Sequence, residues 1–188
     1  QKEHQEKYNI NSVLKILKPN CKIIELDHIT EGAACTTLLA KKFINTSNPL
    51  IIANSDQYIK WDSIKSMYNY NQKKIDGSIL TFEAIHPKWS YAKTDKNNFV
   101  TEVAEKKVIS KNATVGVYYW KKGSDYVNCA ETMIKKNIRV NNEFYVCPVY
   151  NEAIGEGKKI VIDKVSEMHG LGTPDDLKNF ITKKNLTN

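Results

Sequence analysis

Apolar stretches of strand length alternate along this chain with longer stretches in which apolar residues recur at the spacing of an amphipathic helix. The helical spacing predicts helices over residues 13–17, 33–44, 61–71, 124–136 and 142–154, and a last helix after residue 173. The shorter apolar stretches predict strands over residues 21–26, 49–54, 77–83, 89–93, 99–105, 113–120 and 159–163. The last helix has the clearest start, because Thr173 can cap it, Pro174 suits its first position and two acidic residues follow.

The order of these elements indicates an α/β fold. The strand at residues 49–54 is apolar on both faces, as expected of a parallel strand covered by helices on either side. The strands at residues 89–93 and 99–105 flank a polar turn, which predicts a hairpin. The alternation as a whole predicts an open, mostly parallel central sheet with helices on both faces. No repeat or linker interrupts residues 1–188, so we expect a single domain.

Ligands of such sheets bind at the carboxyl ends of the strands, so the residues that follow predicted strands are candidates for a site. Those residues are Gly32, Asp56, Glu105, Lys106, Gly172 and Thr173.

Asp56 follows the most hydrophobic strand of the chain. A carboxylate in that position can hold a hard cation such as Mg²⁺, which prefers oxygen ligands. The alternative is an aspartate that only caps the turn after the strand.

Small residues surround the start of the helix at residue 33, in the segment from Thr30 through Gly32 to Ala33. With no bulky side chain in the way, backbone N–H groups there can approach a nucleobase or an anion. An ordinary helix start with a capping threonine is the alternative.

Glu105 and Lys106 place a carboxylate beside an ammonium group, a pair that can hold sugar hydroxyls and a phosphate. As a surface ion pair, the alternative, they would contribute about 0–1 kcal/mol. Arg139 is the sole guanidinium in the chain and suits either a phosphate or a salt bridge.

Composition and charge remove several function classes. The net charge is +7, but the lysines are scattered in pairs and only one arginine is present, which disfavours nucleic acid as a partner. No apolar run is long enough to span a membrane, and the first residues have no apolar leader, so we expect a cytoplasmic protein. The four cysteines form no C-x-x-C pair, and reduced thiols are expected.

Seven segments in a fixed order, each weak alone, together resemble the sugar-phosphate nucleotidyltransferases. They are TEGAACTTLLA, PLIIANSDQ, GSILTFEA, VTEVAEKK, ATVGVYYW, RVNNEFY and GLGTPDDL, and the resemblance covers about residue 22 to residue 180. The resemblance implies the Rossmann-like nucleotide-diphospho-sugar transferase fold, in which an aspartate after a strand holds Mg²⁺ and a Glu-Lys pair binds the sugar phosphate.

Roles carried over from this family concern ten residues. The resemblance implies a Mg²⁺ ligand at Asp56 and phosphate contacts at Lys106 and Arg139, which with Asp56 are the expected catalytic residues. We therefore expect these three side chains to share one hollow. The remaining implied roles are base and ribose contacts at Thr30, Gly32 and Ala33, and sugar-phosphate contacts at Glu105, Lys106, Asn112, Gly116 and Glu143.

Two departures from the family pattern stand out. Gly170 occupies the place of a second metal-binding aspartate. The strand and glycine-rich loop with which the family begins are also missing, so we expect an N-terminally incomplete domain, short of at least one βαβ-sized piece of about 30 residues.

The reaction implied by the resemblance is Mg²⁺-dependent transfer of a nucleoside monophosphate from a nucleoside triphosphate to a sugar phosphate. Pyrophosphate leaves, and the product would supply surface polysaccharide synthesis. One rival is a metal-dependent glycosyltransferase of related fold, disfavoured because Asn54-Ser55-Asp56 lacks the first carboxylate of an Asp-x-Asp motif. A non-catalytic nucleotide-sugar-binding domain is another, and an oligomer is compatible with the sequence.

Overall fold

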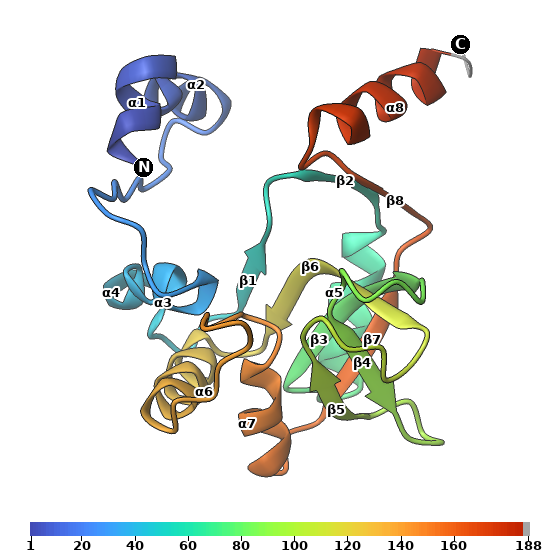
Figure 1. The fold of residues 1–188 in the computed structure, drawn as a ribbon. Coiled ribbons are helices and arrows are strands. Elements are labelled where there is room, and N and C mark those ends of the chain that lie inside the picture. Colours follow the sequence, from blue (N-terminus) through green and yellow to red (C-terminus); the bar gives the residue numbers. More distant parts are fainter. Residues whose placement is uncertain (186–188) are drawn as a thin grey trace.

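The computed structural model describes residues 1–185 (Figure 1). Its helices are α1 (Lys2–Tyr8), α2 (Ile10–Leu17), α3 (Ala33–Leu38), α4 (Lys41–Ile44), α5 (Ser63–Gln72), α6 (Gly123–Lys135), α7 (Val149–Gly155) and α8 (Pro174–Asn185). Its strands are β1 (Leu50–Ala53), β2 (Gln57–Lys60), β3 (Gly77–Glu83), β4 (Tyr91–Thr94), β5 (Val100–Ala104), β6 (Asn112–Trp120), β7 (Ile160–Lys164) and β8 (Glu167–Gly170).

The central sheet has the strand order β5-β4-β6-β3-β7, and β1 also pairs with β6. The predicted α/β class, with helices on both faces of a central sheet, is confirmed. The expectation of a mostly parallel sheet is wrong, because β3–β7 is the one parallel pair among the described strands. The reason is the connections: β3, β4, β5 and β6 follow one another through loops, and only a longer crossover brings a strand back in parallel.

The core lies on both faces of β6, which is buried along almost its whole length. Tyr118 and Trp120 face α6 and α7, whereas Tyr119 faces α5, as the alternation of side chains along a strand requires. Tyr150 of α7 stacks on Trp120 with ring centroids 4.3 Å apart, and its hydroxyl donates to the carbonyl oxygen of Tyr119 at 2.8 Å. This aromatic packing fixes the sheet on which the candidate site is built.

Most predicted elements appear where the sequence placed them. The strands at residues 77–83 and 113–120, the hairpin of β4 and β5, and the helices α2, α5 and α6 are all confirmed. The start of α8 is confirmed as well, because the hydroxyl of Thr173 accepts a hydrogen bond from the backbone N–H of Asp176 at 3.1 Å.

Two predicted helices are only partly present. Residues 33–44 form α3 and α4 with a break between them, and the hydroxyl of Thr37 donates back to the carbonyl oxygen of Ala34 at 2.8 Å, a bond that competes with the helix. Within residues 142–154, the helix is restricted to α7. Residues 142–148 are not helical, because Asn142 has a φ of 64° and Phe144 pairs instead with Glu31.

Two strand predictions also differ from the structure. Residues 21–26 form no strand, because no other described segment pairs with them and an unpaired strand leaves its backbone groups without partners. The strand at residues 49–54 is present as β1, but it runs antiparallel to β6 and leaves Ile51 46% exposed.

Strands β2 and β8 form a separate two-stranded ribbon that leads from the central sheet to α8 (Figure 1). At the other end of the chain, α1 and α2 lie away from the sheet, and an extended segment joins them to α3 (Figure 1). No helix within residues 1–185 has both the length and the apolar character needed to cross a membrane.

Candidate functional site

A cavity of about 310 Å³ lies against the middle of β6. Its wall combines the β5 end, the loop before β4, the start of α3, the segment before α7 and the turn between β1 and β2. The lining residues are Ala33, Asn54, Gln57, Lys88, Trp89, Ser90, Glu105, Lys106, Thr114, Val115, Gly116, Tyr118, Tyr145, Val146 and Cys147. Five segments distant in sequence therefore meet β6 at one cavity.

Glu105 directly follows β5 and is half-buried in the cavity wall. The hydroxyl of Ser90 donates a hydrogen bond to its carboxylate. Burial raises the pKa of the Glu105 carboxyl above its ordinary value, although the Ser90 hydrogen bond and the charge of Lys106 act in the opposite direction. The carboxylate keeps oxygen lone pairs with which a hydroxyl of a ligand can bond.

Lys106 turns its side chain to the exposed edge of the same cavity. Its backbone lies in the left-handed region, at a φ of 53°, and its N–H donates to the carbonyl oxygen of Trp89 at 3.1 Å. The Nζ atom donates to the hydroxyl of Tyr145 at 2.6 Å, and this hydrogen bond raises the pKa of Lys106. The ammonium is therefore held at the cavity in its charged form.

Gly116 interrupts the buried side chains of β6 with a φ of 72°. A Cβ atom there would lie 2.7 Å from Cγ of Asn54, so only glycine lets the β1–β2 turn come this close to the sheet. The N–H of Asn54 donates to the carbonyl oxygen of Gly116 at 2.9 Å. This close approach brings the turn that contains Asp56 to the cavity.

The segment before α3 is pinned to the segment after Arg139. The N–H of Phe144 donates to the carbonyl oxygen of Glu31 at 2.8 Å, and the N–H of Ala34 donates to that of Phe144 at 2.9 Å. Gly32, with a φ of 128°, has no room for a side chain, since a Cβ atom would lie 2.5 Å from the carbonyl oxygen of Phe144. The hydroxyl of Thr30 donates to the carbonyl oxygen of Gly32 at 3.0 Å.

Of the three residues expected to contact the base, only Ala33 lines the cavity. Thr30 and Gly32 shape the backbone beside it. Their assignment as nucleotide contacts stays a prediction.

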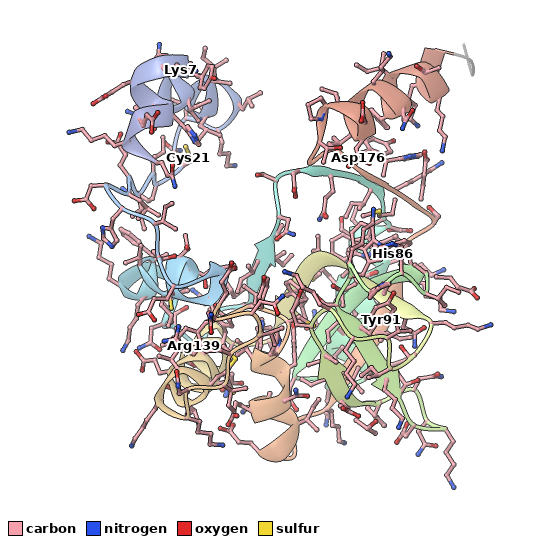
Figure 2. All side chains as sticks on the ribbon, viewed as in Figure 1. Lys7, Cys21, His86, Tyr91, Arg139 and Asp176 are labelled. Carbon is pink, nitrogen blue, oxygen red and sulfur yellow. The ribbon has the colours of Figure 1, made fainter. Side chains whose placement is uncertain are left out.

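Arg139 is committed to protein partners. Its Nη2 donates to the carboxylate of Glu31 at 2.5 Å, its Nη1 to the carbonyl oxygen of Asn142 at 3.0 Å, and its guanidinium carbon lies 3.9 Å from the ring centroid of Phe144. Figure 2 shows Arg139 well apart from His86 and Tyr91 on the other side of the molecule. A phosphate could bind Arg139 only in competition with Glu31.

Asp56 lies in the exposed turn between β1 and β2. Its carbonyl oxygen accepts from the N–H of Leu171 at 2.7 Å, and its carboxylate lies beside Gly172. Neither Asp56 nor Arg139 lines the cavity of Lys106, so the expectation of one hollow shared by all three is wrong. Within residues 1–185, no group of three or more histidine, cysteine or acidic residues is arranged to hold a metal ion.

Two further predicted residues lie outside the cavity wall. Asn112 begins β6 and uses its side-chain amide to donate to the carbonyl oxygen of Ala92 at 3.2 Å. Glu143 is exposed and pairs through its backbone with Val140. The structure gives Asn112 a role in the sheet, and substrate contact by either residue stays a prediction.

Among the cavity residues that sequence reasoning missed, three have polar side chains that bear directly on the site. Ser90 holds Glu105, Tyr145 holds Lys106, and Gln57 lines the wall beside Asn54. Gln57 ends the segment PLIIANSDQ and Tyr145 ends RVNNEFY, so the family resemblance pointed to both segments but not to these two side chains. For Ser90 no signal was available, because only the β4–β5 hairpin brings it to Glu105.

Comparison with known proteins places this architecture among solved structures. The nucleoside-diphosphate-sugar pyrophosphorylase of Vibrio cholerae has a TM-score of 0.74 and 23% identity, and the match covers 93% of this chain and 75% of that chain. A putative glucose-1-phosphate thymidylyltransferase of Bacillus anthracis, solved with sucrose, has a TM-score of 0.69 and 16% identity, with 90% and 70% covered. A UDP-glucose pyrophosphorylase complexed with UDP-glucose has a TM-score of 0.69 and 14% identity, with 96% and 73% covered.

No protein-family model and no curated protein matches the chain. The structural likeness nevertheless establishes the fold, which is the one that the resemblance of the motifs implied.

Proposed function

We propose that this chain, which has the fold of sugar-nucleotide pyrophosphorylases, transfers a nucleoside monophosphate from a nucleoside triphosphate to a sugar phosphate. The observation that supports this most is the cavity itself, because Glu105 and Lys106 both line it. A carboxylate binds hydroxyls and an ammonium binds phosphate, so the pair suits a ligand that has both.

The sugar phosphate would bind with its phosphate on Lys106 and its hydroxyls on Glu105. The second pKa of a phosphate monoester is about 6, so near pH 7 it is mostly the dianion and attacks without a general base. Its oxygen forms a bond to the α-phosphorus of the nucleotide, the bond to the bridging oxygen breaks, and pyrophosphate leaves. The protein is required to hold two anions in line and to neutralise their charge.

Mg²⁺ is the cofactor that the resemblance implies, and the residues fit one carboxylate ligand. Asp56 is exposed and its carboxylate has no hydrogen bond or ion pair with the rest of residues 1–185. Magnesium commonly takes one or two protein carboxylates together with substrate phosphates, so Asp56 alone is compatible with it. Bound there, the ion would offset the negative charge of the nucleotide phosphates.

The glycosyltransferase alternative would use a nucleotide-sugar instead of making one. It has less support, because Asn54 stands where an Asp-x-Asp motif has its first carboxylate and lies against Gly116. We further propose that the nucleotide-sugar product supplies surface polysaccharide synthesis. This part of the proposal rests on the resemblance alone.

The test is pyrophosphate release by the full-length protein with Mg²⁺, each nucleoside triphosphate and a panel of sugar 1-phosphates. We expect release with one pairing, and a loss of about 100-fold in kcat/KM for Lys106→Ala. Lys107→Ala is the matched control, because Lys107 is the next residue but does not line the cavity. If no pairing releases pyrophosphate, the proposal is wrong.

A further inference from the structure

Gln57 carries a buried polar group that nothing in the described structure satisfies. The residue begins β2 and lines the cavity, and its Nε2 atom is buried without a hydrogen-bond partner among residues 1–185. Buried amide groups are almost always hydrogen-bonded, because an unpaired donor keeps the full cost of its desolvation. An orphan donor in a cavity wall therefore indicates a group that a ligand completes.

The surroundings explain why the amide has no protein partner. Gln57 is paired across the ribbon with Gly170, which has no side chain to offer on the same face. Ile59, two residues on and therefore on the same face as Gln57, packs against the buried cluster of Leu80, Val115 and Val117. The amide is thus held toward the central sheet and not toward solvent.

The backbone on either side leaves Gln57 little freedom to turn away. The carbonyl oxygen of Asp56 accepts from Leu171 at 2.7 Å, and Asn54 is bonded to Gly116 at 2.9 Å. One end of the short turn is fixed to β6 and the other to the residue after β8, so the backbone position from which the amide extends is built into the fold.

The charges around the cavity decide what the amide recognises. Lys88 and Lys106 bring cations to the exposed rim, where a phosphate binds best, and Glu105 brings an acceptor to the wall. Gln57 adds a neutral donor in a buried position. A neutral donor matches a neutral acceptor, and the oxygen of a sugar hydroxyl is such an acceptor.

We propose that Nε2 of Gln57 donates a hydrogen bond to one hydroxyl oxygen of the sugar, and that Gln57 thereby determines which sugar phosphate the cavity accepts. This inference rests on the proposed function, since it takes a sugar phosphate as the ligand. Sites that hydrogen-bond a substrate hydroxyl discriminate strongly against analogues that lack it, because their own polar group is then left unpaired.

The experiment measures binding of hexose 1-phosphates and their monodeoxy analogues to the full-length protein by calorimetry, without metal and without turnover. Gln57→Leu removes the amide, Gln57→Glu replaces the donor by an acceptor, and Gln72→Leu is the matched control on the exposed end of α5. For the preferred sugar phosphate we expect about tenfold weaker binding to both Gln57 variants and no change for the control. For one deoxy analogue, the wild type should bind as weakly as Gln57→Leu, and the substitution should add no further loss.

Thermal unfolding separates recognition from a structural role. Because the unpaired donor is a cost to the free protein, Gln57→Leu should melt at the same temperature as the wild type or higher. A lower melting temperature together with unchanged binding would overturn the inference. Equal binding of every sugar phosphate by wild type and both variants would also overturn it, and the proposed function would stand. If the wild type binds no sugar phosphate at all, the proposed function and the inference both fail.

Discussion

The carboxyl group of Glu105 lies in a setting that opposes its ionisation. Its pKa is raised by burial, so the folded protein holds this proton to a higher pH than the unfolded chain does. The stability that the protonated form contributes is present below the ordinary glutamate pKa of about 4.3 and is lost as the pH rises through the raised value. At neutral pH the ionised Glu105 is therefore a net cost to folding.

We expect Glu105→Gln to raise the melting temperature near pH 7, with a difference from wild type that disappears as the pH falls below the ordinary glutamate pKa. The Ser90 hydroxyl can still donate to the new amide oxygen, so that contact is kept. Melting curves over this pH range check the prediction, and Glu102→Gln on the exposed face of β5 is the control. If Glu105→Gln lowered the melting temperature by the same amount at every pH, the prediction would be wrong.

Tyr145 holds the ammonium of Lys106 by a hydrogen bond of 2.6 Å and lies with its ring 4.8 Å from Nζ. Tyr145→Phe keeps the ring and removes the acceptor. We expect several-fold weaker binding of a sugar phosphate near pH 7, because Nζ is no longer held in place. We also expect affinity to fall at a lower pH than in the wild type, because the hydrogen bond is what raises the pKa of Lys106.

Dissociation constants from about pH 7 to about pH 11 test both effects, since an unperturbed lysine titrates near pH 10.4. Tyr68→Phe, an exposed tyrosine on α5, is the control. Identical pH profiles for Tyr145→Phe and wild type would mean that the phenol only fills space.

At the scale of elements, the contact between the start of α3 and the segment around Phe144 forms one wall of the cavity. Gly32→Ala forces a methyl group onto the backbone of Phe144, so we expect a loss of about 2 kcal/mol or more in the free energy of unfolding. Gly157→Ala is the control, because Gly157 also has a positive φ, of 77°, but has open space around it. For Gly157→Ala, the loss in the free energy of unfolding should come from backbone strain alone and be about 1 kcal/mol.

Denaturant unfolding of the two variants measures the difference. Equal losses would show that the close packing of Gly32 on Phe144 adds nothing to the strain of the backbone alone.

Local sequence was sufficient for the long buried strands, and insufficient for short strands and for an apolar segment that pairs with no other strand. The strands β3 and β6 pair with each other and were predicted almost residue for residue. Residues 21–26 have the same apolar character but no partner strand, so the pattern alone overestimates them. The ribbon of β2 and β8 was not predicted, because two four-residue strands that are far apart in sequence have no local signal.

At the scale of the whole molecule, the sequence did not reveal the relative direction of the strands or which loops come together around the cavity. The apolar pattern of PLIIAN is the same whether its neighbour runs parallel or antiparallel, and here β6 runs antiparallel. The site was predicted only in part for the same reason. Glu105, Lys106, Gly116 and Ala33 do meet in one cavity, whereas Asp56 lies in the turn beside it and Arg139 bonds to Glu31.

Asp56→Asn tests the proposed metal ligand in the assembled molecule. Because the carboxylate is exposed and has no partner within residues 1–185, we expect the melting temperature to change little. Pyrophosphate release should fall about 100-fold and require more Mg²⁺ for half-maximal rate. Turnover in Mg²⁺ titrations checks this, with Asp62→Asn at the start of α5 as the matched control, because asparagine keeps the helix cap that Asp62 provides. Unchanged turnover in Asp56→Asn would remove the metal assignment.

Arg139 is the one basic residue of this chain that is arginine and not lysine, and its contacts explain why. The guanidinium reaches three separate acceptors, on Asn137, Asn142 and Glu31, while its flat face covers the ring of Phe144. A lysine has a single charged nitrogen and no planar face. It would therefore leave some of these acceptors without a hydrogen bond and the ring of Phe144 without a stacking partner. This corner of the molecule therefore depends on the planar shape of its cation as much as on its positive charge.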